Sequence, residues 1–200
     1  RYNGLPNASI LLGVGCVLAC QITSAADQLD WVPKSELSVE QQKLIGPSCG
    51  GLYIDPLAQE AAPKDLDKEP ICVDANTANM SEGQKVHLNG DVNISQGSRR
   101  LKAADMHYDK QGDEASLTGG VEIRQPGAVI RGREARVSMS KNQAQFSGGE
   151  FVLHATHLRG SAQTIEQTST GKGILQDGKL TSCEPGSQTW LLEGSTLTID

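Results

Sequence analysis

The chain has 200 residues, a formal net charge of −6 and a sequence pI of 5.2. An acidic balance disfavours nucleic acid, and the sequence carries no polybasic patch for an anionic membrane surface. We therefore expect no nucleic-acid partner. The length is sufficient for one domain with a sizeable core.

The N-terminus carries a short apolar run, ILLGVGCVLAC, from Ile10 to Cys20, followed by the small residues Thr23 to Ala26. This pattern predicts a signal peptide over residues 1–26, and the run is too short to span a bilayer. The last four residues of the run also approximate a lipoprotein signal, in which Cys20 would be acylated. Either interpretation predicts an exported protein.

Cleavage near Ala26 leaves three cysteines, Cys49, Cys72 and Cys183. An exported protein meets an oxidising compartment, where cysteines normally pair, so we predict a disulfide bond. An odd number indicates a buried free thiol or a partner outside this chain. The spacings contain no CxxC, which disfavours a redox motif and a zinc knuckle. The residues alone leave the pairing open.

Residues 27–70 read as an irregular segment that ends in a charged, proline-bearing linker at 58–70. Within it, LSVEQQKLIGP predicts one short helix. Ser38 can cap this helix, Gln41 completes a capping box, and Gly46-Pro47 stops it.

From Ile71 onward the sequence changes to short alternating runs and repeats itself. LNGDVNISQG at 88–97 matches LTGGVEIRQP at 117–126, and weaker copies follow at 146–155 and 175–184. The leading apolar residues are 29 apart (117 − 88, 146 − 117, 175 − 146). Each unit reads as two short strands joined by a turn, so four units predict about eight strands, with Ile71 to Met80 adding a partial one.

Within each strand the apolar period is two, which predicts one oily and one polar face. In the third and fourth units the apolar residue after the glycine position slips by one place, to Phe151 and Leu180, and we interpret this slip as a β-bulge. Recurrent glycines disfavour helices. The prediction is an all-β fold whose interior, poor in aromatic residues, leaves room for a groove.

The sequence offers little catalytic or metal-binding chemistry. His154 and His157 are three apart, which on a strand places them on opposite faces, and we interpret both as solvated strand histidines. His87 and His107 look isolated. The carboxylates Asp105, Asp109, Asp113 and Glu114 lie near Gly112 and are typical of an exposed hairpin tip. We predict no catalytic residue, no metal site and no cofactor.

A polysaccharide-acting parallel β-helix is the enzymatic alternative. It predicts three strands in each coil and carboxylates stacked at one repeat position. Here each unit holds two strands, and aspartates do not recur at one position.

Four stretches together resemble the N-terminal periplasmic part of the LptD family of outer-membrane proteins, the organic solvent tolerance proteins with an OstA/LptA-like domain. They are LDWVPKSEL (29–37), GPSCGGLYIDP (46–56), GDVNISQGS (90–98) and TSCEPGSQTW (181–190).

The resemblance implies an open β-jellyroll over residues 71–200, followed beyond Asp200 by a large C-terminal β-barrel. It implies lipopolysaccharide transport into the outer leaflet of the outer membrane, without catalysis, by a domain that lies in the periplasm. A stand-alone periplasmic bridge of the same fold is the alternative.

The implied partners are lipopolysaccharide, the bridge protein LptA, and the outer-membrane lipoprotein LptE through the barrel. The edge near Ile71 to Met80 would accept the last strand of LptA by β-augmentation. Lipid A acyl chains would be shielded by six apolar residues, Leu88, Val92, Ile94, Leu117, Val121 and Ile123. A dozen exposed methylenes cost roughly 10 kcal/mol, at about 0.8 kcal/mol each, so such a shield is needed.

The family links its N-terminal cysteines to a cysteine pair in the barrel, and Cys49 and Cys183 match those positions. Cys72 has no counterpart in this pattern. Either a Cys49–Cys72 bridge or a free buried thiol remains possible for it.

Overall fold

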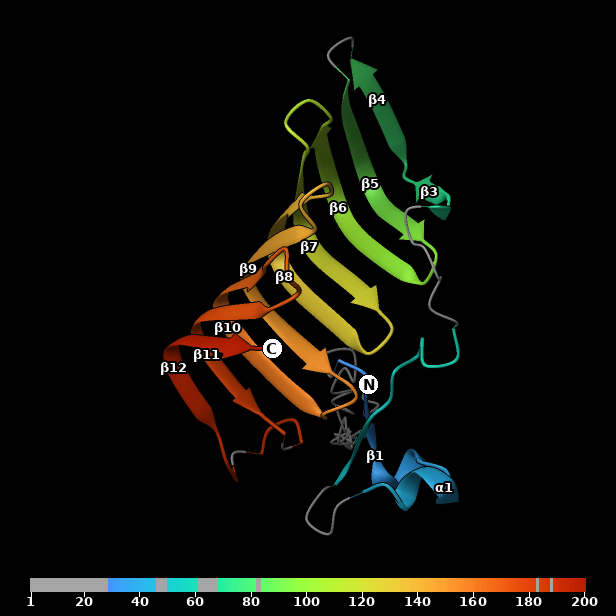
Figure 1. The fold of residues 1–200 in the computed structure, drawn as a ribbon. Coiled ribbons are helices and arrows are strands. Elements are labelled where there is room, and N and C mark those ends of the chain that lie inside the picture. Colours follow the sequence, from blue (N-terminus) through green and yellow to red (C-terminus); the bar gives the residue numbers. More distant parts are fainter. Residues whose placement is uncertain (1–28, 46–49, 61–67, 82–83, 183, 188) are drawn as a thin grey trace, which may run out of the picture.

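The computed structural model describes residues 29–45, 50–60, 68–81, 84–182, 184–187 and 189–200 (Figure 1). The signal peptide, Cys49, Cys183 and most of the expected linker lie outside these residues. A two-stranded sheet, β1 (Trp31–Pro33) with β2 (Gly51–Tyr53), accompanies a ten-stranded sheet. The large sheet consists of β3 (Ile71–Asp74), β4 (Thr77–Ser81), β5 (Lys85–Gln96), β6 (Arg99–Asp109), β7 (Glu114–Gln125), β8 (Ala128–Ser138), β9 (Gln143–Leu153), β10 (Leu158–Gln167), β11 (Gly173–Thr181) and β12 (Leu192–Ile199).

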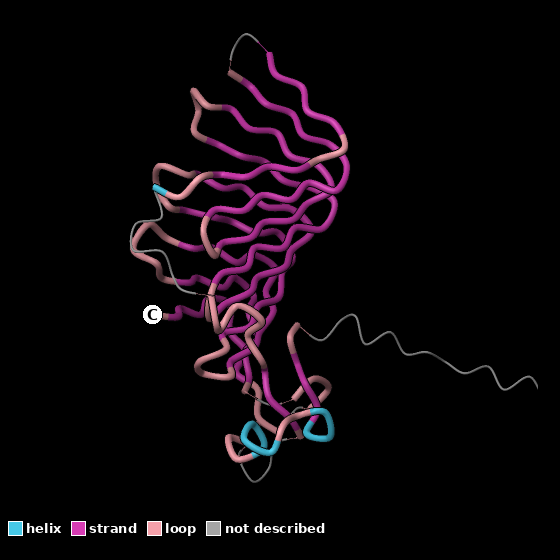
Figure 2. Tube along the Cα trace, turned by 90° about the vertical axis from the view of Figure 1, so that its right-hand side faces the viewer, coloured by secondary structure: helices cyan, strands magenta, loops and turns pink. Residues whose placement is uncertain are grey.

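The large sheet is an antiparallel meander in which each strand from β5 to β12 pairs with the next. Each 29-residue unit supplies two of these eight strands, as the repeat predicts. The expected partial strand forms as β3 and β4, which both pair with β5 at one edge of the sheet, while β12 forms the opposite edge (Figure 1). Figure 2 shows the strands stacked as a twisted ladder. The prediction of an all-β, open β-jellyroll is confirmed.

In β5, β7, β9 and β11 the backbone adopts a left-handed conformation, with positive φ, at the glycine position of the repeat. Positive φ angles occur at Gly90 and Asp91, at Gly119 and Gly120, and at the equivalent positions of the third and fourth units, Gly148 and Asp177. Glycine adopts such angles without steric cost, and aspartate tolerates them better than most residues. At Gly119 a Cβ would also lie 2.4 Å from the Cβ of Ala104.

The predicted position of the bulges is wrong. The register shifts lie at Gly90-Asp91 on β5 and at Gly119-Gly120 on β7, in the first and second units. The pairings of β9 and β11 carry no shift. On the neighbouring strand β8, the inward-facing residues Ile130 and Val137 are also an odd number of positions apart. The one-residue slip on β9 is therefore matched by a slip on the adjacent strand, and the pairing register is kept. The extra residue instead belongs to β5 and β7.

The described parts of the N-terminal segment, residues 29–45 and 50–57, include side chains that pack on the outer face of the large sheet. The predicted capping box of α1 (Val39–Gln42) is present, with reciprocal hydrogen bonds between Ser38 and Gln41. Leu29 and Tyr53 bury themselves against Val129 of β8 and Val152 of β9. The segment, which also contains the 3-10 turn η2 (Lys34–Glu36), is therefore anchored on the jellyroll. None of the helices in the described ranges is long and apolar enough to cross a membrane.

Candidate functional site: the groove inside the jellyroll

Two rows of apolar side chains run across the inner face of the sheet from one edge to the other. The first apolar row, given by the strand registers, consists of Val73, Ile94, Leu101, Ile123, Ile130, Phe151, Gly160, Leu180 and Leu192. The second apolar row consists of Ala78, Leu88, Met106, Leu117, Ala135, Phe146, Ile165, Leu175 and Leu197. The two rows lie on opposite sides of the repeat glycines.

The two rows face each other because the sheet folds over. In their middle they form one hydrophobic cluster around Leu117, Phe146 and Phe151, which are 0, 1 and 3% exposed. At the edges the rows reach the surface, and Val73 and Leu192 are 52 and 50% exposed. The apolar interior is therefore continuous from edge to edge and open at both ends.

A cavity of about 420 Å³ opens between the two folded halves. One wall comes from the ends of β5, β6 and β7, with Ile94, Leu101 and Ile123. The other wall comes from the opposite ends of β8 and β9, with Val137 and Ala144, and polar side chains such as Gln125 and Ser140 surround it. The site is an oily slot with a polar rim.

The six predicted lipid-binding residues all lie on the inner face but differ in access. Leu88, Val92, Leu117 and Val121 are 5, 1, 0 and 1% exposed and fill the core. Ile94 and Ile123 are half-buried and line the cavity. Whether any of the six contacts a lipid stays a prediction.

Sequence reasoning missed the second wall of the cavity. Val137, Met139 and Ala144 lie at the β8–β9 hairpin, where no repeat motif marks them. The period-two alternation of β8 could have indicated Val137, because it shares a face with Ala135.

Charged side chains cover the outer face behind the first apolar row. Lys102, Glu122, Arg131 and Glu150 stand opposite one another on successive strands, with alternating signs. Glu122 bonds to Arg131 at 2.7 Å and to Arg124 at 3.3 Å. Burial raises the pKa of Glu122, but these arginines outweigh it and the net pKa lies below the ordinary value. The outer face is thus polar while the inner face is oily.

An ionic latch holds the N-terminal segment on this outer face. Asp30 forms an ion pair with Arg124 of β7 and accepts a 2.9 Å hydrogen bond from Nε2 of His154. Asp55 accepts a 2.6 Å hydrogen bond from the Gly127 N–H. Burial opposes charge on Asp30 and His154, but the contacts with His154 and Arg124 outweigh it and lower the pKa of Asp30, and the hydrogen bond to Asp30 helps to raise the pKa of His154.

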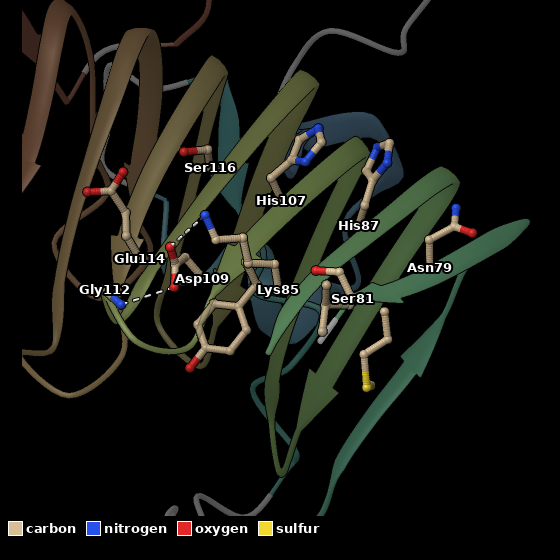
Figure 3. A pocket seen from close by; sticks show the side chains of 12 residues that line it. Asn79, Ser81, Lys85, His87, His107, Asp109, Gly112, Glu114 and Ser116 are labelled. Atoms are coloured by element: carbon tan, nitrogen blue, oxygen red, sulfur yellow. Dashed lines mark hydrogen bonds and ion pairs between the residues drawn. The ribbon is translucent and has the colours of Figure 1, made fainter. Parts of the chain in front are cut away.

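The histidine predictions are wrong for all four residues, since His154 and His157 lie in the turn after β9 rather than on a strand, and His87 and His107 are not isolated. His154 is only 6% exposed, because the docked N-terminal segment covers it. His87 and His107 stand directly opposite each other on β5 and β6, and their rings stack 3.9 Å apart (Figure 3). The error for His87 and His107 arises because the pairing register of β5 and β6 brings together two residues that are twenty positions apart in the sequence.

The carboxylates divide into hairpin residues and one exception. Asp109 accepts hydrogen bonds from the Gln111 and Gly112 N–H groups, as a hairpin tip requires. Asp113 accepts bonds from Ser138 and Ser140 of the next hairpin. Asp105 is wrongly assigned to the tip, since it lies within β6 between His87 and His107.

Cys72 lies in β3 and is free and exposed, which contradicts both alternatives offered for it. Cys49 and Cys183 lie outside the described residues. Their chain neighbours are joined, because the Gly50 N–H donates to a carboxylate oxygen of Glu184 at 2.6 Å.

The fold and the two facing apolar rows define an open β-jellyroll with an oily interior. Comparison with solved structures finds the same fold in LptH, described as the LptA homologous periplasmic component of the lipopolysaccharide transport device of Pseudomonas aeruginosa. The TM-score is 0.51 at 17% identity, over 69% of this chain and 99% of that one.

The family model for lipopolysaccharide-assembly, LptC-related proteins matches residues 61–164, and the chain belongs to this family. It is 43% identical over 180 residues to the LPS-assembly protein LptD of Saccharophagus degradans, covering 90% of this chain and 21% of the relative. It is 35% identical over 176 residues to LptD of Pseudomonas putida, covering 86% of this chain and 19% of the relative. The chain thus spans about a fifth of the length of these relatives, and the resemblance to LptD is confirmed.

Proposed function

We propose that this domain shields the acyl chains of lipopolysaccharide during transport to the outer leaflet of the outer membrane. The observation that carries the proposal is the pair of apolar rows, which run from edge to edge and reach solvent at both edges. Identity of 43% to an LPS-assembly protein LptD favours this role over that of a stand-alone bridge.

The groove suits an acyl chain rather than a compact ligand. Each methylene removed from water contributes about 0.8 kcal/mol, and a continuous row offers similar contacts at every step. An acyl chain is therefore shielded from water along the groove, and no single position binds it so strongly that it would be trapped. The polar rim leaves the sugar headgroup in solvent. The acyl chain would enter the cavity between Ile123 and Val137, which lie on its two opposite walls.

The protein acts as a carrier and makes or breaks no covalent bond in this proposal. Among the described residues, the cluster of His87, Asp105 and His107 lies on the outer face, behind the groove. Most side chains that line the cavity are apolar or uncharged, such as Leu101, Gln125 and Ala144, and the charged ones are Arg99 and Arg100.

The exposed edge formed by β3 and β4 supports docking of a bridge protein such as LptA. Both strands are exposed throughout, and each pairs with β5 on one side. A strand added there would extend both apolar rows, which end at Val73 and Ala78. Transfer to a barrel with LptE, at the outer membrane, completes the proposed route from the periplasm.

Cys49 and Cys183 would tether the domain to such a barrel through disulfide bonds. Non-reducing mass mapping of the protein tests this part. Disulfides from either cysteine to a cysteine beyond Asp200 support the tether, and a Cys49–Cys183 bridge contradicts it.

A charge placed in the groove tests the carrier function. Ile123→Asp puts a carboxylate in the cavity wall, whereas Thr118→Asp puts the same charge on the exposed outer face of the same strand. We expect Ile123→Asp to abolish binding of lipopolysaccharide to the folded protein and Thr118→Asp to preserve it. Equal binding by the two folded variants would contradict the proposal.

A further inference from the structure

On the outer face of β5 and β6, two histidines and one aspartate converge. His87 and His107 occupy directly opposed positions on adjacent strands, and Asp105 is two residues before His107. Nε2 of His87 lies 2.9 Å from Oδ2 of Asp105, and Nε2 of His107 lies 3.2 Å from its Oδ1. Figure 3 shows the two rings side by side on neighbouring strands. One carboxylate thus faces two imidazoles.

We propose that these three side chains form a binding site for a divalent transition-metal ion of the zinc class. Two imidazole nitrogens and one carboxylate are a donor set that Zn²⁺ accepts, with the fourth position left to water. The three donor atoms already lie within 4.8 Å of one another.

Metal binding requires the two imidazole rings to reorient. Tetrahedral zinc with Zn–N bonds of about 2.0–2.1 Å places its nitrogen ligands about 3.3 Å apart. The rings are stacked at 3.9 Å with their planes 13° apart, so their nitrogen lone pairs are nearly parallel and the rings must rotate apart at their ligating edges to reach one ion. His107 is 65% exposed and His87 38% exposed, which leaves both free to rotate and open to solvent.

Asn89 supplies a supporting contact that a metal site requires. Its Nδ2 donates to Oδ2 of Asp105 at 2.6 Å and so orients the carboxylate between the two rings. Hydrogen bonds to ligating carboxylates typically fix their direction and strengthen metal binding. These contacts also lower the pKa of Asp105, with the Asn89 hydrogen bond as the largest cause.

The site lies beside the edge of the sheet. His87 stands opposite Asn79 of the edge strand β4, and His107 stands opposite Ser116 on the other side. A bound ion would link β5 to β6 directly behind this edge and raise the temperature at which the protein unfolds. The site is separate from the groove, so it goes beyond lipid transport.

Zinc titration of the full chain, followed by the imidazole nitrogens of ¹⁵N-histidine-labelled protein, tests the proposal. Histidine resonances separate this site from any thiol that also binds zinc. We expect His87 and His107 to shift together and to saturate at one equivalent below about 1 mM zinc. His154 and His157 keep their positions.

Variants complete the test. His87→Gln and His107→Gln should each weaken binding by at least about 10-fold, and Asn89→Ala by about 10-fold or more through loss of orientation. His157→Asn is the control, because asparagine tolerates its φ of 51°. Failure of the two resonances to shift by about 1 mM zinc, or unchanged affinity in His87→Gln, would overturn the proposal.

Discussion

The latch between Asp30, Arg124 and His154 makes a prediction about how the N-terminal segment stays docked. Asp30→Asn removes the anion while it keeps the size of the side chain. The side chains of Asp30, Arg124 and His154 are 14, 12 and 6% exposed, so Arg124 and His154 lose a largely desolvated negative charge as their partner.

The magnitude follows from burial and from the partner that remains. Breaking a buried ion pair typically costs 3–5 kcal/mol, but here Arg124 keeps Glu122 at 3.3 Å. We expect a loss of about 2–3 kcal/mol, confined to the segment because the apolar contacts of the sheet interior are untouched. Hydrogen exchange of the amides of β1 and β2 measures this opening directly.

The same latch predicts a dependence on pH. The lowered pKa of Asp30 means that its contribution is present above about pH 4, its unfolded value, and is lost as the pH falls through the lower folded value. The raised pKa of His154 means that its contribution is complete below about pH 6.5 and is lost as the pH rises through the higher folded value. Protection of β1 should therefore be greatest between these limits.

Asp30→Asn should flatten both sides of that profile, whereas Asp74→Asn, at an exposed carboxylate of β3, should leave it unchanged. Equal exchange of β1 in wild type and Asp30→Asn across this pH range would refute the reasoning, since the segment would then be held by apolar contacts alone.

Three further predictions concern the core, the edge and the bend. Phe146→Ala, at a residue 1% exposed, should lower the free energy of unfolding by about 3–5 kcal/mol in denaturant titrations, and a loss below about 1 kcal/mol would mean that the rows are not packed. Val73→Pro in β3 should abolish binding of the bridge protein in a pull-down while the circular dichroism spectrum is retained; undiminished binding would place the docking edge elsewhere. Gly119→Val should destabilise the fold more than Gly120→Val, because Ala104 blocks a Cβ only at the former, and thermal melts giving the reverse order would contradict the bend geometry.

The repeat was predictable because its signals are local. Side-chain alternation and the 29-residue repeat indicate the strands, and the capping box of α1 needs only Ser38 and Gln41. The sequence could not place the bulges, because a bulge is a relation between two strands. An odd step shared by neighbouring strands, as at Phe151, leaves the register intact.

The candidate site was only partly predictable for a related reason. Side-chain alternation correctly indicates which face of β5 and β7 points inward. It does not indicate which inward-facing residues along the strand line the open cavity and which are packed in the core. Val121 is 1% exposed and Ile123 is half-buried, although both occupy the same repeat unit and the same face. Folding of the sheet decides the difference, since the opposite half covers the level of Val121 and leaves a cavity at Ile123.

Photocrosslinking in cells tests the central claim, that lipid passes through the groove, most directly. A photoreactive residue at Ile123 faces the cavity, and one at Thr118 faces solvent on the outer side of the same strand. The account predicts adducts with lipopolysaccharide at Ile123 and none at Thr118. Adducts at Thr118 without adducts at Ile123 would show that the cargo travels outside the groove and would contradict the account.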